Sequence, residues 1–595
     1  MAAHPLFAPA RLGGRLLRNR VVMPSMTTRL ADDEGFVTPA SLAYYLARAK
    51  GGCGLITVEM ASPERAGRHR LFELGIYDDK FLPGLSRLVA ALKAEGAATS
   101  IQLGHGGGHT RRDISGEDPI APSAIPHPVY EVTDATVVPL AMSAERIEET
   151  IAAHLAAAKR AQEAGFDFVE VHGCHGYLIS QFMNGFENRR TDAYGGSLAN
   201  RARFGLEILR RLKAELPELP VIFRMNAEDF FPGGLVFDEA IEIARWAAAE
   251  GVAALHVSAG HYRSLPSAER MIPPMAYAEG LFLDYAERIK AAVPVPVIAV
   301  GRLGNPSVAM AAIDQGKADF IALGRPHIAD PDWVAKAAKG LPVRRCIACN
   351  TCINEMRGGA KIGCLVNGRA GRESELAPHS PIRGERICII GAGPAGLTYA
   401  GLAAPGNRVT VLERDEVCGG SLRLAAKAPF FQEVKAALPP ILTYIAELER
   451  AALAAGVEIH FGADPLHDPA LLRGYDRIVI ATGARYPPLL EALVRLALLL
   501  PGAALRPLFK RKRLREWLYT RARRPSAARI AALAPKGTPV EVIGDAFKAG
   551  KSKDAVAAAF KAALAPAPAP ISGSSLRAER GAGPESRNTG VSNLS

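Results

Sequence analysis

The sequence predicts an α/β protein in which an N-terminal (β/α)8 barrel is followed by a Rossmann-like domain. Within the first 340 residues, eight short apolar runs rich in β-branched residues alternate with helical patterns. Near residue 390, a glycine-rich turn lies between an apolar run and a helical pattern. A chain of 595 residues is also too long for one hydrophobic core, so two or three domains are expected.

The eight predicted strands divide the first part of the chain at regular intervals. The stretches between them, such as 151–165 and 237–251, carry apolar residues at three- and four-residue spacing and end in glycine, as amphipathic helices do. An open doubly wound sheet is the alternative, but it would not usually need eight repeats. The strands are expected at residues 21–25, 54–60, 99–105, 168–173, 220–226, 254–260, 296–302 and 319–325.

Polar side chains gather at or just after the carboxyl ends of these strands. They are Gln102, His105, His172, Arg224 and Arg302. In a barrel those strand ends converge on one mouth, which is the usual location of catalysis. One isolated histidine would more often be a structural residue with satisfied hydrogen bonds, whereas several polar residues at equivalent ends favour a functional site.

One long segment identifies a family resemblance. Residues 169–204, VEVHGCHGYLISQFMNGFENRRTDAYGGSLANRARF, resemble the signature of the Old Yellow Enzyme family of flavin oxidoreductases. Further motifs agree with that family in order, and the likeness extends over residues 5–335. They are PSMTT at 24–28, QLGHGG at 102–107, FRMN at 223–226, VGR at 300–302 and LGRPHIADPDW at 323–333.

The resemblance implies FMN in the barrel mouth, and the residue types fit that cofactor. Gln102 and Arg224 suit the pyrimidine edge of the flavin, where the Arg charge stabilises negative charge near N1. Thr27 is expected to hydrogen-bond the carbonyl beside N5, and backbone amides after the last two strands are expected to bind the phosphate. The expected FMN contacts are Pro24, Met26, Thr27, Gln102, Arg224, Gly301, Arg302, Gly324 and Arg325.

His172 and His175 form an H-x-x-H motif, and Tyr177 follows two residues later. Metal binding is the generic alternative, but two histidines without a third ligand make a weak site. By resemblance, the two histidines bind a substrate carbonyl or carboxylate oxygen, and Tyr177 protonates the α-carbon while FMN N5 delivers hydride to the β-carbon. The chain departs from the family at Gly108, where arginine is common, and this departure concerns the substrate pocket.

Four of the eight cysteines lie within residues 346–364, with the spacing C-x2-C-x2-C-x11-C. Zinc sites usually show two separated pairs, whereas a tight trio resembles the start of [4Fe–4S] ferredoxin motifs. A cluster directly after the barrel is typical of the 2,4-dienoyl-CoA reductase and trimethylamine dehydrogenase branch, and the x2-x2 gaps are nearer the amine dehydrogenases. We expect the ligands to be Cys346, Cys349, Cys352 and Cys364. Ordinary small buried residues are expected at Cys53, Cys174, Cys388 and Cys418.

The run RICIIGAGPAGL at 386–397 predicts a dinucleotide site. It combines a strand, the glycines Gly391, Gly393 and Gly396, and a helix, and a second strand ends at Glu413, which can bind the adenosine ribose. Segments 474–484 and 540–556 resemble later FAD-binding segments of the same branch, with Gly544 and Asp545 near the ribityl and pyrophosphate groups. Only residues 485–539 stand where dienoyl-CoA reductases carry an NAD(P)H subdomain, and they contain no second glycine fingerprint. FAD or ADP is therefore expected, and NAD(P)H remains a candidate electron donor without a recognisable subdomain.

The sequence suggests the following division of the chain. Residues 1–340 form the barrel, 341–370 the iron–sulfur segment, 371–385 a linker, 386–563 the FAD- or ADP-binding domain and 564–595 a disordered tail.

The formal charge of +12 is concentrated in one place, because residues 485–536 contain thirteen Lys/Arg and two Asp/Glu. The basic segment 506–524 is either a solvated helix or a docking surface for an acidic partner or a membrane. A domain-wide basic face for nucleic acid is not indicated.

No signal peptide or membrane span is evident, so we expect a cytoplasmic protein that acts on a small molecule. Two functions fit. One is the reduction of an activated C=C bond of enoate, enoyl or dienoyl type. The other is amine dehydrogenation or N-demethylation, with electrons leaving through the cluster to an external flavoprotein. Aromatic residues that would cage an alkylammonium are not obvious near the motifs, so the reductase comes first. The substrate, an electron-transfer partner and a homo-oligomeric state stay open.

Overall fold

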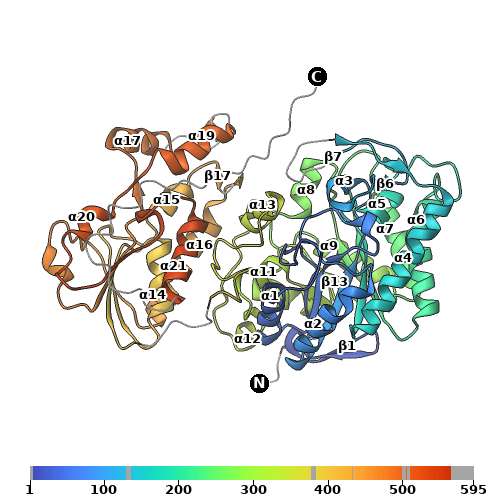
Figure 1. Ribbon diagram of the computed structural model, residues 1–595, viewed down its shortest axis with the longest axis horizontal. Coiled ribbons are helices and arrows are strands. Elements are labelled where there is room, and N and C mark those ends of the chain that lie inside the picture. Colours follow the sequence, from blue (N-terminus) through green and yellow to red (C-terminus); the bar gives the residue numbers. More distant parts are fainter. Residues whose placement is uncertain are drawn as a thin grey trace.

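The computed structural model describes residues 4–128, 136–376, 383–431, 433–498, 504–505 and 509–564. Figure 1 shows two lobes, a barrel and a smaller sheet with its helices, and the cysteine segment lies between them. The predicted tail beyond residue 564 and part of the predicted linker lie outside the described residues. Among the helices described, none is long and apolar enough to cross a membrane.

Eight parallel strands form a closed barrel, which confirms the first predicted fold and shows that the open-sheet alternative is wrong. Closure is made by the last strand, which pairs with the first: Ile321 lies opposite Val21. Each strand overlaps one of the runs predicted from the sequence. The strands are β3 (Val21–Met23), β4 (Leu55–Ala61), β5 (Ala98–Leu103), β10 (Phe168–Gly173), β11 (Val221–Asn226), β12 (Ala254–Ser258), β13 (Val297–Ala299) and β14 (Phe320–Ala322).

Helices between the strands bury their apolar stripes on the outside of the barrel. Helix α4 (Ala144–Glu163) begins earlier than the sequence pattern indicates, because the hydroxyl of Ser143 accepts a hydrogen bond from the backbone N–H of Arg146. Helices α6 (Leu198–Glu215) and α7 (Phe237–Ala249) follow the same amphipathic pattern.

The amino end of the barrel is closed by side chains. The hairpin of β1 (Ala10–Leu12) and β2 (Arg15–Leu17) packs Leu12 and Leu17 into a cluster with Phe168, Ile222 and other residues of the barrel strands. That end therefore offers no space to a ligand. The open end is the carboxyl end of the strands, where the predicted polar residues lie.

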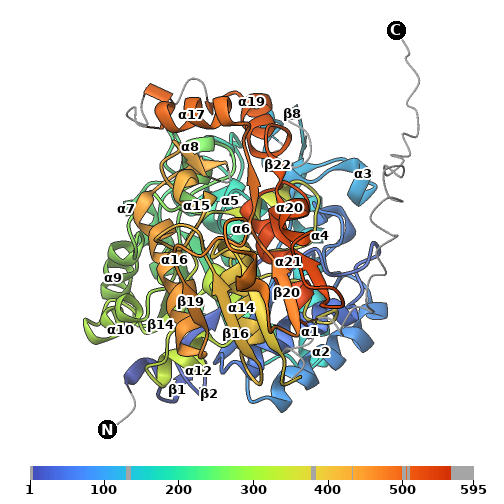
Figure 2. The same ribbon diagram turned by 90° about the vertical axis from the view of Figure 1, so that its left-hand side faces the viewer.

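The second lobe is a five-stranded parallel sheet in the order β19-β16-β15-β20-β23. Its strands are β15 (Arg386–Ile390), β16 (Arg408–Leu412), β19 (Glu458–His460), β20 (Arg477–Ile480) and β23 (Val540–Val542). Helices α14 (Pro394–Ala403), α16 (Leu438–Ala454) and α21 (Ser552–Leu564) lie on the side of the sheet that faces the barrel (Figure 1). Helices α17 (Pro488–Ala497) and α19 (Lys512–Glu516) lie together at one end of this lobe in both views (Figures 1 and 2).

The cysteine segment belongs to two hydrophobic cores at once. Three residues of the segment pack in the barrel core: Cys352 and Met356 within helix α13 (Thr351–Arg357), and Ile362 after it. Cys349 and Leu365 pack in the core of the second lobe. The segment therefore lies between the two lobes and contributes side chains to each.

Buried arginines fix this segment to the barrel. Arg29 donates from Nε to the carbonyl of Met356 at 2.7 Å. Arg48 forms an ion pair with Glu373 at 2.5 Å, and both side chains are almost fully buried. Glu373 comes from the stretch that the sequence assigns to the linker, so at least the start of that stretch is packed against the barrel. These contacts set the position of the cysteines relative to the strands.

Replacing Arg48 by methionine should lower the free energy of unfolding by about 3 kcal/mol, because it leaves the Glu373 carboxylate buried without its cation. Denaturation in guanidinium chloride measures the change. The matched control is Arg211→Met, which breaks the half-exposed pair of Arg211 and Glu148 on the same lobe. It should change the unfolding free energy by less than about 1 kcal/mol. Equal effects of the two substitutions would contradict the anchoring role of Arg48.

Candidate functional site

A cavity of about 470 Å³ opens at the carboxyl end of the barrel strands. Helix α16 of the second lobe and Cys346 also line it, so the cavity lies beside the cysteine segment. The twelve barrel residues that the sequence analysis assigns to FMN binding or to catalysis all line this one cavity. They are Pro24, Met26, Thr27, Gln102, His172, His175, Tyr177, Arg224, Gly301, Arg302, Gly324 and Arg325.

A buried hydrogen-bond chain orients Gln102. The amide Oε1 of Gln102 accepts from Ser25 Oγ at 2.9 Å, and its Nε2 donates to Glu170 Oε1 at 2.7 Å. The other carboxylate oxygen of Glu170 lies 2.7 Å from Nδ1 of His256. Burial alone would raise the pKa of Glu170, but His256 and Arg224 hold it below its usual range. Glu170 is therefore charged, and Gln102 is held in one orientation.

Arg224 brings a positive charge to the cavity. Its Nη1 donates to the carbonyl of Ser25 at 3.3 Å, while its buried Nε has no hydrogen-bond partner among the described residues. Burial and the Arg224 charge lower the pKa values of His172 and His175 well below the usual range. Both imidazoles are therefore neutral at neutral pH. An unsatisfied guanidinium N–H beside Gln102 fits the anionic edge of a reduced flavin.

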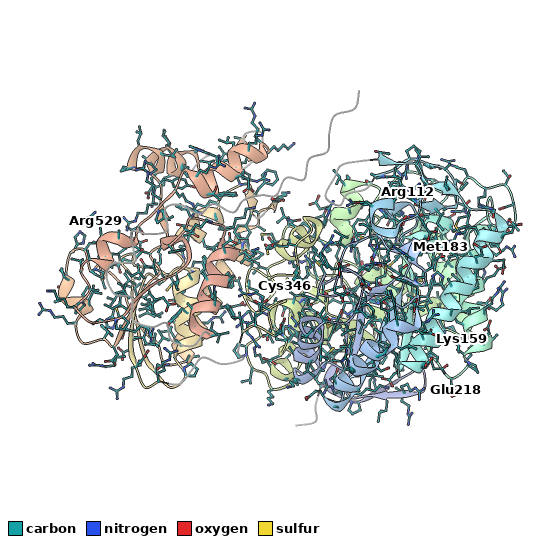
Figure 3. The ribbon with its side chains drawn as sticks, viewed as in Figure 1. Arg112, Lys159, Met183, Glu218, Cys346 and Arg529 are labelled. Carbon is teal, nitrogen blue, oxygen red and sulfur yellow. The ribbon has the colours of Figure 1, made fainter. Side chains whose placement is uncertain are left out.

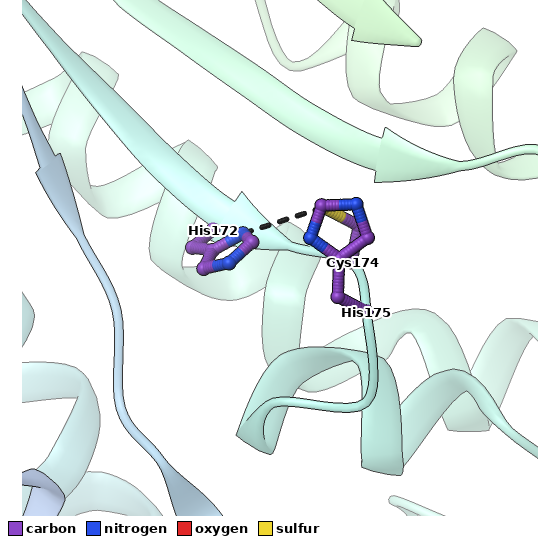
Figure 4. A group of neighbouring side chains, drawn as sticks. All are labelled: His172, Cys174 and His175. Atoms are coloured by element: carbon purple, nitrogen blue, oxygen red, sulfur yellow. Dashed lines mark hydrogen bonds between the residues drawn. The ribbon is translucent and has the colours of Figure 1, made fainter. Parts of the chain in front are cut away.

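His172, Cys174 and His175 are the only described group of three His, Cys, Asp or Glu residues with ligand atoms within 4.8 Å of one another. Figure 4 shows Cys174 beside His172, with the Sγ and Nδ1 atoms 3.3 Å apart. Burial raises the pKa of the Cys174 thiol, and the Arg224 charge lies nearby. A protonated thiol beside a guanidinium disfavours a bound cation, so we interpret the two histidines as neutral hydrogen-bonding groups. Nε2 of His175 lies 2.8 Å from Ser258 Oγ.

Two residues that the sequence analysis missed contact Tyr177. Arg70 donates from Nη2 to the Tyr177 hydroxyl at 3.3 Å and from Nη1 to Thr27 Oγ1, and it lines the cavity. Nε2 of His69 also lies 3.3 Å from the Tyr177 hydroxyl. Both residues belong to the loop after strand β4, and charged residues in a loop after a barrel strand are the signal that could have found them. His105 does not line the cavity, because its ring turns to Glu64 at 3.1 Å.

Two arginines gather at the other end of the cavity. Arg302 donates to the carbonyl of Pro274, and Arg325 donates to the carbonyl of Pro273 and to Asn350 Oδ1. In the part of the chain that the structure describes, neither guanidinium forms an ion pair with a carboxylate. Burial and the neighbouring Arg325 lower the pKa of Arg302. Two cations without a counter-charge fit the phosphate of FMN, and Arg325 connects that end of the cavity to the cysteine loop.

The four clustered cysteines are close enough to interact electrostatically. Electrostatic coupling joins Cys352 to the other three, and burial raises the pKa of Cys349 to about 11 and that of Cys364 to about 12. Among the described residues no three of these sulfur atoms lie within 4.8 Å of one another. Figure 3 shows Cys346 between the two lobes.

The backbone of the cysteine loop is strained. Ala348 and Asn350 have φ angles of 50° and 53°, in the left-handed region that residues other than glycine rarely adopt. Asn tolerates this region, whereas alanine pays about 1 kcal/mol for it. Such outliers are typical of functional loops, because the surrounding structure must maintain them. Here the turn brings Cys346, Cys349 and Cys352 near one another.

The three fingerprint glycines have three different roles. Gly391 has a φ of 106°, which makes the tight turn after strand β15. A Cβ on Gly396 would lie 1.9 Å from the carbonyl oxygen of Gly391, so its absence permits close packing of helix α14. A Cβ on Gly393 would meet nothing within 4 Å, which leaves open space above the backbone where a pyrophosphate can approach. This part of the site therefore fits a dinucleotide or ADP.

A second cavity of about 430 Å³ lies over this turn. Gly391, Gly393, Glu413 and Asp545 line it, whereas Gly396 and Gly544 lie beneath its surface. The Glu413 carboxylate accepts hydrogen bonds from the backbone N–H of Ala392 at 2.7 Å and of Asp415 at 3.0 Å. It therefore supports the glycine turn as well as lining the site.

Residues of the basic segment form part of the wall of this second cavity. Leu518, Tyr519 and Arg523 line it, and Arg523 forms an ion pair with Asp545 at 2.8 Å. Arg515 is buried and donates to the carbonyl of Phe509. Part of the positive charge that the sequence places at 506–524 is thus used inside the protein, and residues 506–508 lie outside the described residues.

Residues 5–344 match the family described as NADH:flavin oxidoreductase / NADH oxidase. The chain belongs to this family. It is a flavin-dependent oxidoreductase of the Old Yellow Enzyme type, and the matched residues include all eight strands of the barrel. Residues 389–433, which contain the three glycines, match a model described as an NAD(P)-binding Rossmann-like domain.

Relatives and solved structures cover both lobes. An NADH oxidase from Thermoanaerobacter brockii is 38% identical over 490 residues, which make up 80% of this chain and 73% of that protein. A cinnamate reductase from Clostridium sporogenes is 32% identical over 505 residues, 80% of this chain and 74% of that protein. Histamine dehydrogenase from Rhizobium sp. 4-9 has a TM-score of 0.72 at 28% identity and covers 81% of this chain and 69% of its own. A 2-naphthoyl-CoA reductase has a TM-score of 0.83 at 24% identity, with coverage of 94% and 99%, and supports the fold alone.

The glycine roles predict different outcomes for two similar substitutions. Gly393→Ala should leave the thermal stability unchanged but lower the amount of adenine nucleotide that co-purifies, because the added methyl occupies the open space above the turn. Gly396→Ala should lower the free energy of unfolding of the second lobe by about 2 kcal/mol or more, because its Cβ overlaps a backbone carbonyl. Nucleotide released by heat and thermal unfolding measure the two effects. Full nucleotide content in Gly393→Ala would contradict this assignment.

Proposed function

We propose that the protein reduces an activated C=C bond, with FMN bound in the barrel cavity. The observation that carries this proposal is the contact between the Arg70 guanidinium and the Tyr177 hydroxyl. A tyrosine that gives up its proton becomes a phenolate, and an adjacent fixed cation stabilises that phenolate. The arrangement suits an acid that protonates carbon.

The charges around Tyr177 also favour an oxygen-bearing substrate over an ammonium ion. Arg70 and Arg224 line this part of the cavity. The acidic residues that line the cavity, Glu279 and Glu447, are associated with Asn305 and with Arg345 respectively, away from the Tyr177 hydroxyl. A cationic amine would meet two guanidinium groups there. A carbonyl or carboxylate oxygen that gains negative charge would meet hydrogen-bond donors and positive charge.

Each side chain has a defined task in this reaction. The neutral His172 and His175 donate hydrogen bonds to the substrate oxygen and polarise the adjacent C=C bond. Tyr177 delivers a proton to the α-carbon from Oη. Arg70, which also donates to Thr27, donates directly to Tyr177, orients it and stabilises the phenolate. FMN, when bound, supplies the hydride for the β-carbon.

We further propose an electron route through the cysteine segment. Cys346, Cys349, Cys352 and Cys364 would hold a [4Fe–4S] cluster, and the second lobe would hold FAD, with ADP as the alternative. The position of Cys346 on the wall of the barrel cavity and the packing of Cys349 in the core of the second lobe support a relay between the two sites. Electrons would come from NAD(P)H or from an electron-transfer protein.

Amine dehydrogenation is the second candidate. The tight C-x2-C-x2-C spacing, the short stretch 485–539 and the likeness to histamine dehydrogenase favour it. In that case electrons would run outward, from the barrel flavin through the cluster to an external acceptor. The direction of electron flow therefore separates the two functions.

Anaerobically purified holoenzyme, reduced with dithionite and mixed with α,β-unsaturated acids, ketones or thioesters, should regain oxidised flavin absorbance and form the saturated product. The Arg70→Met variant should lower kcat/KM for the best substrate by about 100-fold, because the phenolate loses its counter-charge. The matched control is Arg65→Met, which changes an exposed arginine of the same loop. It should keep wild-type kinetics.

The opposite experiment tests the second candidate. Oxidised holoenzyme is titrated with histamine, dimethylglycine and trimethylamine, and the flavin absorbance is followed. Bleaching by an amine, together with no reoxidation by any unsaturated compound, would replace the proposed reductase by an amine dehydrogenase.

A further inference from the structure

The loop after strand β4 carries a histidine that contacts Tyr177 and a carboxylate that contacts this histidine. Nε2 of His69 lies 3.3 Å from the Tyr177 hydroxyl, and Nδ1 of the same ring lies 2.9 Å from Glu73 Oε2. All three residues are buried, with exposed fractions of 4%, 4% and 2% for Tyr177, His69 and Glu73. A phenol, an imidazole and a carboxylate therefore contact one another in a largely buried cluster.

The loop holds Glu73 firmly in this position. Oε2 of Glu73 accepts hydrogen bonds from the backbone N–H groups of His69 and Arg70, both at 3.2 Å. Phe72, directly before it, has a φ of 61°, a conformation that a bulky residue adopts only under constraint. This turn returns the Glu73 side chain to His69.

Glu73 carries a negative charge. Burial alone would raise its pKa, but His69, Arg68 and Arg70 together lower it below the usual range. The Glu73 carboxylate lies against Nδ1 of His69, so the imidazole presents Nε2 to the Tyr177 hydroxyl.

Other groups near Tyr177 are poor proton sources. Arg70 contacts the same hydroxyl, but a guanidinium does not give up a proton at neutral pH. The rings of His172 and His109 lie 4.8 Å and 5.6 Å from the Tyr177 ring. Burial, together with Arg224 for His172 and with His127 for His109, holds the pKa values of both well below the usual range, so they are neutral.

We propose that His69 reprotonates Tyr177 after each turnover, with Glu73 as the residue that positions His69. This inference rests on the proposed reductase function. In each cycle the C=C π bond breaks, the β-carbon gains a hydride from the reduced flavin and the α-carbon gains the phenolic proton of Tyr177. The phenolate then takes the Nε2 proton of the His69 imidazolium, and the imidazole regains a proton from water. Glu73 and Arg70 keep their charges throughout.

The test is a burst experiment on the holoenzyme of His69→Ala, with His69→Gln as a second variant in case the first folds poorly. The first turnover uses the proton already on Tyr177, so it should run at the wild-type rate. Later turnovers should be slower by about 100-fold, which gives a burst of one product per active site. Imidazole added to the buffer should accelerate the slow phase of His69→Ala.

The matched control is His105→Ala, because His105 and Glu64 form another histidine–glutamate pair, 3.1 Å apart, that does not line the cavity. This variant should show neither a burst nor rescue by imidazole. Wild-type steady-state rates in both His69 variants would overturn the inference. A burst of equal size in His105→Ala would overturn it as well, because the effect would then be a general consequence of altered packing.

A second measurement does not depend on turnover. In protein labelled with [ζ-¹³C]tyrosine, the Tyr177 signal is assigned as the one missing from Tyr177→Phe. His69→Ala should shift this signal, and His105→Ala should leave it in place. An unshifted signal in His69→Ala would contradict the contact on which the relay depends. If the wild-type enzyme reduces no unsaturated compound, the proposed reductase function is wrong. If the wild-type enzyme turns over normally but the His69 variants show no burst, only the proton relay is wrong.

Discussion

The structure depends on the burial of one short segment, residues 346–364, between two hydrophobic cores. Cys352 packs with the barrel and Cys349 packs with the second lobe, so the segment contributes side chains to both cores. The Arg48–Glu373 ion pair fixes the chain that follows. Because these contacts are rigid and dry, four thiols are brought together beside the barrel cavity. The same packing puts any redox group that they hold between the two ligand sites.

A concentration of positive charge at the barrel cavity is the second feature that organises the molecule. Arg224 and Arg70 lie at one part of the barrel cavity, and Arg302 and Arg325 lie at another. Four guanidinium groups around one cavity favour a bound anion, so the cavity is suited to a phosphate and to a reaction that develops negative charge. Arg325 also contacts Asn350 in the cysteine loop, so the phosphate end of the cavity and the cysteines share one guanidinium.

Much of this could be predicted from the sequence, because strand periodicity, glycine spacing and cysteine spacing are local signals. All eight barrel strands overlap their predicted runs, and the twelve expected barrel residues share one cavity. Glu170 could also have been predicted from the sequence, because the alternation of side chains along a strand puts it on the same face as His172. His69 and Arg70 offered only the weaker signal of charged residues in a loop after a barrel strand, and Glu73 offered none, because all three approach Tyr177 through an irregular turn at Phe72 that has no periodic pattern. His105 shows the reverse case: its position after a strand was read correctly, but only the structure reveals that its ring turns to Glu64.

The central claim is that electrons pass between the second lobe and the barrel cavity through the cysteine segment on their way to a C=C bond. Rapid freeze-quench EPR of fully reduced holoenzyme mixed with an α,β-unsaturated substrate tests it most directly. The account predicts a reduced iron–sulfur signal before mixing, which disappears in step with product formation. A cluster signal that persists while the barrel flavin is reoxidised, or no iron–sulfur signal at all, would contradict it.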